Sequence, residues 1–572
     1  MPRRRATSLG LGLALGILTP AGPAAAVGPD GALAATPASD ATILHVLNRL
    51  TFGPRPGDLE RVREQGLEAW IDAQLDGERI AETALETRLA DLRTLRYSTA
   101  ELFKKYEVPR EVKREALERI QAQGESPEDV SPEMRRQLYR ELRDKVPHME
   151  GPPRRVVEEL QAAKILRAVY AERQLEEVLV DFWMNHFNVY ALKGPVKFLL
   201  PEYERTIRSH ALGRFEDLLR ATAESPAMLF YLDNWLSVDP EAAERTKARH
   251  EQRMRGGLFG RRGRRWRGDP EADAVRREAL ARRSGLNENY ARELLELHTL
   301  GVEGGYTQED VREVARVFTG WTIRGLRERE PEFAFEARIH DPGDKRVLGR
   351  RVAGGGAEEG RSVLHQLATH PATARFVSSK LAGRLVADDP PTALVERTAG
   401  VFLDTRGDIR EVVRAIVTAP EFRAPETRGV KIKTPFEFVA SALRASGADV
   451  EDTRELHRRL AEMGMPLYLQ QPPTGYKDTA DAWVSTSGLL ARLNFALDLA
   501  AGRLRGVRGG PALGLDLDRL EGEELTGALA AKLVPAGLSE TTRATLDGEA
   551  ASGRDAPRVA GLILGSPEFQ RR

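Results

Sequence analysis

The sequence predicts a mainly α-helical, multi-lobed protein with one small β-hairpin. Three observations support this fold class. From about residue 41 onward, apolar residues recur every three or four positions, which is the helical period. The chain has 572 residues, too many for one ordinary hydrophobic core, and two or three lobes are therefore expected. Only residues 333–339 alternate between apolar and other residues with a period of two, which is typical of a β-strand.

The N-terminal residues have the three parts of a secretory signal peptide. A basic stretch at Arg3–Arg5 precedes a short apolar stretch at 8–19, and Ala24–Ala26 supplies small residues for cleavage. We therefore expect residues 1–26 to be removed and the mature chain to be periplasmic or extracellular. The Sec and twin-arginine routes both stay open, as does an uncleaved anchor. Residues 27–40 are rich in Ala, Gly and Pro and predict a flexible linker.

The composition excludes several function classes. Cysteine is absent, so the chain cannot form disulfides, bind metal through thiolates or use a cysteine nucleophile. Lys plus Arg and Asp plus Glu both number 86, so the net charge gives no reason to expect nucleic acid as a partner. After the predicted signal peptide, no segment is apolar for long enough to cross a bilayer.

The first half of the chain divides into blocks by composition. Residues 41–238 predict an N-terminal helical region, within which residues 97–150 carry dense alternating charge and predict solvated helices. Residues 239–284 predict a basic, disordered loop, because ten Lys or Arg residues face a single Glu in the segment 245–267. Contact with an anionic cell envelope through 245–267 is the functional interpretation that we prefer, and nucleic acid is the less favoured partner.

The second half predicts a core helical region at 285–505, with the hairpin at 333–349, and a C-terminal helical segment at 506–572. A repeated device also appears, in which an apolar helix ends just before a proline because proline disfavours helical geometry in the residue before it. It occurs at Pro226, Pro420 and Pro567. The last two copies continue to a phenylalanine that should pack against the helix just ended, so this device is structural.

The densest run of polar residues lies in one predicted helix, Asn287–Gly301. In α-helical geometry Asn289 and Glu293 share one face, and Arg292 belongs to a ladder of charges at intervals of four residues. His298 lies on the apolar face. So many polar groups on an apolar helix indicate either that they are buried against hydrogen-bonding partners or that they line a cleft.

Two further histidines join the candidate set. His186 lies among aromatic residues, where burial would lower the pKa of its imidazole and leave it a base or a ligand. His340 and Asp341 begin the turn of the predicted hairpin. Histidine and carboxylate side chains are the ligands available for a divalent metal. The sequence has no H-E-x-x-H spacing, nucleophile elbow, phosphate loop or dinucleotide fingerprint, so the cofactor stays open.

Several runs of the sequence together resemble a large bacterial family that is catalogued only as domain of unknown function 1800. The runs are 45–53, 182–187, 287–301, 304–311, 340–349, 433–437, 472–476 and 566–569. The resemblance covers about residues 41–570, apart from the charged segment and the basic loop. It implies an exported protein, often encoded beside an exported family that resembles alkaline phosphatases or sulfatases. It implies a location and a partner but no activity.

Three functional hypotheses remain open. The favoured one is a non-catalytic scaffold or partner of an exported phosphatase- or sulfatase-like protein, with the polar residues of the Asn287–Gly301 helix as a buried network. The second is a hydrolase-type enzyme in which histidine and carboxylate groups act as acid and base or hold a divalent metal. The third is a glycan- or envelope-binding module that uses Trp321, Tyr476 and Trp483 as a stacking platform.

Overall fold

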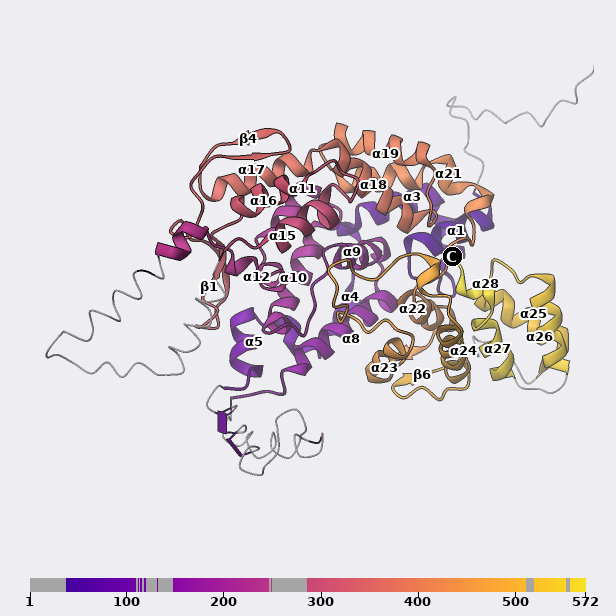
Figure 1. Ribbon diagram of the computed structural model, residues 1–572. Coiled ribbons are helices and arrows are strands. Elements are labelled where there is room, and N and C mark those ends of the chain that lie inside the picture. The colour runs from indigo at the N-terminus through magenta and orange to yellow at the C-terminus, as the bar shows by residue number, and fades with distance from the viewer. Residues whose placement is uncertain are drawn as a thin grey trace, which may run out of the picture.

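The computed structural model is mainly α-helical, as the sequence predicts (Figure 1). It describes residues 38–109, 148–245, 285–510, 519–551 and 556–572, with a few isolated positions between them. The predicted signal peptide, nearly all of the predicted linker, and most of the charged segment and of the basic loop lie outside the described residues. Within the described ranges, no helix is both long and apolar enough to cross a membrane.

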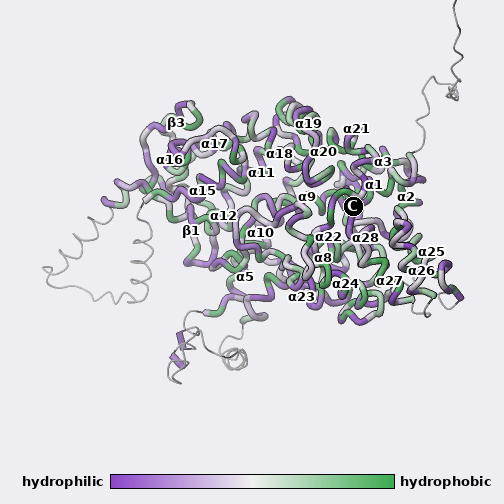
Figure 2. The backbone as a smooth tube through the Cα atoms, turned by 45° about the vertical axis from the view of Figure 1, so that its right-hand side comes forward, coloured by the Kyte–Doolittle hydropathy of each residue, from purple (hydrophilic) through white to green (hydrophobic). Residues whose placement is uncertain are grey.

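The larger of two hydrophobic clusters holds the N-terminal and central helices. The helices up to residue 231 are α1 (Asp40–Leu50), α2 (Asp58–Gln65), α3 (Leu67–Leu75), α4 (Thr83–Leu89), α5 (Thr99–Tyr106), α8 (Arg154–Tyr170), α9 (Gln174–His186), α10 (Val196–His210), α11 (Phe215–Ala223) and α12 (Pro226–Tyr231). The central helices are α15 (Glu288–Glu293), α16 (Gln308–Val317), α17 (Ala357–Ala368), α18 (Pro371–Leu385), α19 (Thr392–Asp404), α20 (Ile409–Val417) and α21 (Pro420–Arg423). The tube alternates between hydrophobic and hydrophilic stretches, as amphipathic helices around a core require (Figure 2).

The second hydrophobic cluster holds the C-terminal helices. These are α22 (Pro435–Ser446), α23 (Arg454–Glu462), α24 (Thr486–Ala500), α25 (Gly522–Leu533), α26 (Glu540–Ala551), α27 (Ala556–Leu564) and α28 (Pro567–Gln570). Helix α8 joins the two clusters, because Val156 and Leu160 belong to the first and Ile165 and Val169 to the second. The end of the chain returns to the middle of the molecule, near α1 and α22 (Figure 1).

Short 3-10 turns connect several helices. They lie at Gly77–Arg79, Arg93–Arg96, Asn234–Leu236, Pro425–Thr427 and Ala480–Ala482. The proline device is confirmed in the structure, since α12, α21 and α28 all begin at the prolines that stop the preceding helix. Phe422 and Phe569 are buried, as the device predicts.

The predicted hairpin at 333–349 is wrong in its pairing. Strand β2 (Glu332–Phe335) pairs backwards with β1 (Trp321–Arg324), and β3 (Lys345–Val347) pairs forwards with β4 (Arg350–Val352). The second hairpin turns at Leu348 and Gly349, which have φ of 49° and 74°. A tight two-residue hairpin requires positive φ at both central residues. This turn therefore pairs β3 with the next strand along the chain, β4, and not with β2. A third two-stranded sheet joins β5 (Asp449–Val450) to β6 (Val507–Arg508).

The helix predicted over Asn287–Gly301 begins and ends as expected but changes type in the middle. The Asn287 side chain accepts from the amide of Asn289, which makes Asn287 the N-cap. After Glu293 the chain continues as a π-helix over Leu294–Thr299, and the amide of Leu300 donates to the carbonyl of Leu295, five residues back. The wider turn changes the faces expected from α-helical spacing. Single π-helical turns are rare and frequent at functional sites.

Candidate functional site

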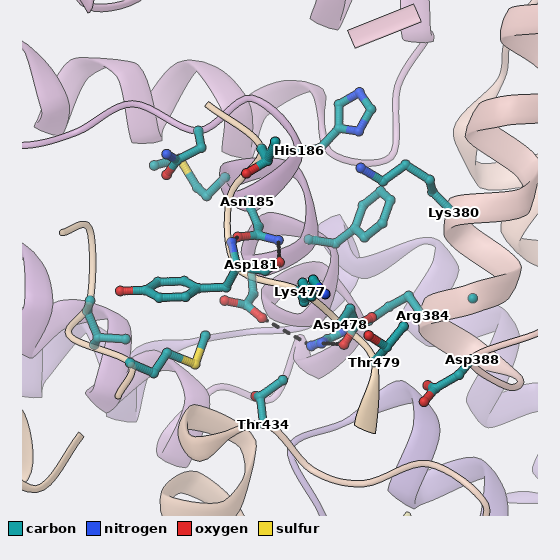
Figure 3. Close-up of a pocket in the computed structure, with 18 of the residues that line it drawn as sticks. Asp181, Asn185, His186, Lys380, Arg384, Asp388, Thr434, Lys477, Asp478 and Thr479 are labelled. Atoms are coloured by element: carbon teal, nitrogen blue, oxygen red, sulfur yellow. Dashed lines mark hydrogen bonds and ion pairs between the residues drawn. The ribbon is translucent and has the colours of Figure 1, made fainter. Parts of the chain in front are cut away.

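A cleft of about 340 Å³ lies where the two hydrophobic clusters meet. Its walls come from α9, α18 and residues 465–479, which are far apart in the sequence (Figure 3). Tyr468 packs against both clusters and lines the cleft. Its φ is 62°, a left-handed conformation that strains an aromatic residue and that is found disproportionately at functional sites. The junction between the clusters is therefore the candidate site.

The loop at 472–479 is fixed to α9 by paired hydrogen bonds. The Asn185 amide donates to the carbonyl of Tyr476 at 2.7 Å and accepts from the amide of Tyr476 at 2.7 Å. Asn188 donates to the carbonyl of Pro472 at 2.9 Å. Gly475 has φ of 68°, and a Cβ there would clash with the backbone oxygen of Asn185. The close approach of loop and helix therefore requires glycine at this position.

The charged floor of the cleft is organised by Arg384 of α18. Its guanidinium lies 3.1 Å from Asp181, 2.9 Å from Glu437 and 3.2 Å from Asp478. A second guanidinium, that of Arg572, lies 3.0 Å from the same oxygen of Glu437. Although burial opposes ionisation, these two cations hold the pKa of the Glu437 carboxyl well below its usual range. This network connects α9, α18, α22 and the last residues of the chain.

Two lysines extend the network. Lys164 of α8 lies 2.6 Å from Asp181, and Lys431 lies 2.6 Å from Asp388 and 2.9 Å from the carbonyl of Asp478. Most of these side chains are buried or half-buried. Each buried ion has therefore lost its hydration. The ion pairs stabilise the fold only where counter-charges and hydrogen bonds in the protein fully replace the lost water.

The partners are not complete, because cations outnumber carboxylates around this floor. Among the described residues, the buried cations that interact with Glu437 or Asp478 are Arg49, Arg384, Lys431, Arg492 and Arg572. The carboxylates are Asp181, Asp388, Glu437 and Asp478. Several buried guanidinium nitrogens in this group have no hydrogen-bond partner: Nε and Nη1 of Arg49, Nε of Arg384, Nη2 of Arg492 and Nε of Arg572. Of these cations only Arg384 lines the cleft, so the excess positive charge lies in the buried network behind it.

Lys380 extends into the cleft one helical turn before Arg384. No ion pair or hydrogen bond joins its amine to another residue in the described part of the chain. Its nearest aromatic neighbour is Phe376, whose ring centre lies 5.4 Å from the amine. Burial lowers the pKa of Lys380 to about 8. The charge of Asp478 opposes this shift in part, but no carboxylate forms an ion pair with the amine among the described residues, so the amine is available to a ligand.

His186 and His298 lie together behind Lys380. Their ring centres are 6.3 Å apart, and Nε2 of His186 donates to the main-chain oxygen of His298 over 3.1 Å. Burial, together with the charge of Lys380, lowers the pKa of both imidazoles, that of His298 to about 3. Nδ1 of His186 and Nε2 of His298 are buried without a partner. Because a carbonyl only accepts, the contact defines His186 as the neutral Nε2–H tautomer, with a free lone pair on Nδ1.

His340 and Asp341 belong to a different cluster and do not line this cleft. His340 contacts the carbonyl of Thr319 at 2.8 Å and the carboxylate of Glu359 at 3.0 Å. Glu359 also lies 2.6 Å from the buried amine of Lys345. Asp341 pairs with Arg316 at 2.7 Å, and this contact follows from the β3–β4 hairpin that forms here. Each polar group has partners, which is typical of a structural network.

The three polar candidates of the Asn287–Gly301 helix lie on its outer side. Arg292 contacts Glu288 and Gln308 at 3.5 and 3.0 Å, and Asn289 is exposed. Burial and the neighbouring Glu296 raise the pKa of Glu293. Only His298 from this helix approaches the cleft. The structure thus brings together His186 and His298 and leaves the other candidates elsewhere.

Two other expectations concern metal and glycan. Within the described ranges, no group of three or more His, Asp or Glu side chains could hold a metal ion, so a bound metal stays a prediction. Trp321 is fully buried against Phe318 and Phe333, and Trp483 is also buried. Their ring faces are therefore not exposed for a sugar, and the three proposed aromatics do not form a stacking platform.

Lys380, Arg384 and Asp478 were not among the site residues that the sequence predicted. The first two are four residues apart in a helix of mixed composition, and nothing in their spacing separates them from an ordinary solvated pair. Asp478 follows a loop whose polar and aromatic residues were noticed. Helical spacing places Lys380 and Arg384 on one face, but only the packing of α18 against α9 turns that face inward.

A family model described as "Protein of unknown function (DUF1800)" matches residues 45–571. The chain belongs to this family. No curated protein and no solved structure matches the chain. Three of the runs that carry the resemblance to the DUF1800 family supply residues that line the cleft: 182–187, 433–437 and 472–476. A fourth run, 566–569, contacts Lys433 behind it. Family membership defines no reaction, but these runs of the DUF1800 chain meet at one place.

Proposed function

We propose that this DUF1800 chain binds a small anionic molecule in the cleft, with the Lys380 amine as the group that pairs with the anion. The observation that carries the proposal is Lys380, which lines the cleft without an ion pair among the described residues, in front of a buried network in which cations outnumber carboxylates. A cleft of about 340 Å³ falls in the usual size range of small-molecule sites. Carboxylate, phosphate and sulfate groups share the required chemistry.

Buried cations that lack counter-charges destabilise the protein. An unpaired buried ion costs several kcal/mol in real proteins, even after relaxation. An anion that enters beside Lys380 offsets part of this cost and gains a charge-assisted hydrogen bond. The neutral histidines behind the lysine do not compete for the anion.

The test is saturable stabilisation against heat. Purified full-length chain is titrated with phosphate, sulfate, acetate and citrate at constant ionic strength, which separates site binding from general salt effects. One of these anions should raise the melting temperature by about 2 °C or more at saturation. Lys380→Gln should abolish the rise, and Lys380→Arg should keep it. Lys532→Gln, an exposed lysine on α25, is the matched control.

If no anion stabilises the wild type, or if Lys380→Gln responds like Lys532→Gln, the proposal is wrong. Stabilisation that never saturates would also contradict it, because a general salt effect has no site.

A second candidate function is that of a scaffold for an exported phosphatase- or sulfatase-like protein. The observation that favours it is a set of exposed apolar side chains at the start of α24, after the loop that lines the cleft. These are Val484, Leu489 and Leu490, which are 50%, 37% and 57% exposed. Co-purification with the product of the neighbouring gene tests this role, and Leu490→Asp should weaken recovery. Equal recovery with wild type and variant would exclude this surface.

We also propose that the chain acts outside the cytoplasm. The support is the basic, apolar and small-residue pattern of residues 1–26. Cell fractionation of the native host should find the chain without those residues in the periplasm or medium. Recovery of the full-length chain from the cytoplasm alone would contradict this location.

A further inference from the structure

His186 and Lys380 both line the inner end of the cleft. Figure 3 shows the Lys380 amine directed toward the His186 imidazole, and the lysine is the charged side chain that acts most strongly on His186. Since Nε2 of His186 donates to the carbonyl of His298, the other nitrogen carries the lone pair. That nitrogen, Nδ1, has no partner in the part of the chain that the structure describes.

The surroundings of Lys380 favour the neutral amine. Phe182 and Phe376 supply apolar surface near its stem, and no carboxylate pairs with it among the described residues. Burial lowers the pKa of Lys380 to about 8. At pH 8 about half of the Lys380 amines are thus neutral, against below about 1% of ordinary lysines with a pKa near 10.4. A neutral amine that faces an open cleft is a nucleophile toward carbonyl carbon.

We infer that Lys380 forms an imine with a small oxo acid, a molecule that carries a carbonyl group beside a carboxylate. This inference rests on the proposed function for the carboxylate, and adds a covalent step for the carbonyl. Other lysines of the cleft are poorly placed for this role, because Lys164 is paired with Asp181 and Lys477 with Asp481.

The step balances without an oxidant or a reductant. The lone pair of Lys380 attacks the carbonyl carbon, a C–N bond forms, and the carbonyl oxygen takes a proton to give a carbinolamine. Loss of that oxygen as water, with a second proton, gives a protonated imine. Water in the cleft accepts the proton that the ammonium must lose before attack, and the solvent returns a proton as water leaves. The product keeps one positive charge at Lys380, so the substrate carboxylate keeps its counter-charge.

The experiment is reductive trapping. Purified full-length chain is incubated at pH 8 with pyruvate, glyoxylate or 2-oxoglutarate and cyanoborohydride, and peptides are examined by mass spectrometry. Cyanoborohydride reduces the imine to a stable secondary amine. The peptide containing Lys380 should carry the adduct at least about tenfold more than the peptides containing Lys477 or Lys532, as the difference in neutral amine predicts.

Two variants define the result. Lys380→Arg keeps the charge, and should therefore retain anion stabilisation and lose the adduct. Asp478→Asn removes the carboxylate whose charge raises the pKa of Lys380, and it should therefore move the pH profile of trapping to lower pH, with circular dichroism to verify folding. Acetate and phosphate, which have no carbonyl, should stabilise without an adduct.

The outcomes separate the two proposals. If anions stabilise the chain through Lys380 but no oxo acid is trapped there, the imine inference is wrong and the binding proposal stands. Equal labelling of the Lys380, Lys477 and Lys532 peptides would also overturn the inference. An adduct on Lys380 without any saturable anion effect would support the imine and contradict the binding proposal.

Discussion

The guanidinium of Arg384 lies 2.9 Å from the carboxylate of Glu437, and both side chains are buried. This contact joins α18 of the first hydrophobic cluster to α22 of the second, directly beneath the cleft. The same carboxylate receives Arg572 at 3.0 Å. Glu437 is thus the group on which two buried cations depend.

Removing the charge of Glu437 should destabilise the protein strongly. In Glu437→Gln two buried guanidiniums lose their main counter-charge, and breaking a buried pair costs about 3–5 kcal/mol. The measurement is the free energy of unfolding from urea denaturation. Glu358→Gln removes a carboxylate that is 72% exposed and paired with Arg361, and it should cost below about 1 kcal/mol. A loss at Glu437 no larger than this control would refute the central role of the residue.

Stability should fall as the pH drops below about 6.5. Burial lowers the pKa of His45 to about 4, of His298 to about 3 and of His457 to about 4. The unfolded chain therefore binds more protons than the native chain between these values and 6.5. Each of these histidines then removes up to about 1.4 kcal/mol of stability per pH unit.

Unfolding free energies between pH 7 and pH 5 test this slope. Replacing His457 by Gln should flatten it, whereas replacing the exposed His365 by Gln should leave it unchanged. A pH-independent stability over this interval would contradict the burial of neutral histidines.

Lys433 should make stability rise with pH in the alkaline range. Its amine donates to Ser441 at 2.8 Å and to the carbonyl of Phe569 at 2.6 Å, and burial lowers its pKa to about 7. Between pH 7 and about 10.5 the unfolded chain holds a proton on this lysine that the native chain has lost, so the native state gains with rising pH.

The difference in unfolding free energy between wild type and Lys433→Met isolates this contribution. It should grow from pH 7 to pH 9.5 in favour of the wild type. Lys532→Met, in which an exposed lysine is replaced, should show no such trend. A constant difference for Lys433→Met would show that its amine is charged in the native state.

Gly475→Ala should weaken anion binding, whereas a control variant with a similar loss of stability should not. A Cβ at this position would clash with the backbone oxygen of Asn185 and push the loop 472–479 away from α9. Gly429→Ala is the matched control, because Gly429 has a similar φ of 64° but no atom near its Cβ direction. Both changes should cost about 1–2 kcal/mol from left-handed backbone strain.

Calorimetric titration of both variants with the anion that stabilises the wild type measures the difference. Gly475→Ala should bind less tightly, and Gly429→Ala should bind like the wild type. Equal affinities would show that the position of the loop does not define the site.

Local signals in the sequence predicted much of the fold. Proline begins α12, α21 and α28, as the proline device predicted. The predicted pairing of the hairpin was wrong because β1, a strand of four residues that begins at Trp321, is too short to be recognised by its alternation. The π-helix at 294–299 was not predicted, because the spacing of side chains does not show whether a backbone amide donates to the carbonyl four or five residues back.

The sequence by itself determined the helical fold class, the absence of thiol chemistry and membership in the DUF1800 family, since each follows from local period, composition or matched runs. It also singled out His186 and His298. Only the tertiary structure decided that these two meet, that His340 does not join them, and that Lys380 and Arg384 face a cleft. The physical reason is that cleft, charge excess and unpaired amine are properties of packing between α9, α18 and α22. They depend on distances between residues hundreds of positions apart, about which helical periodicity carries no information.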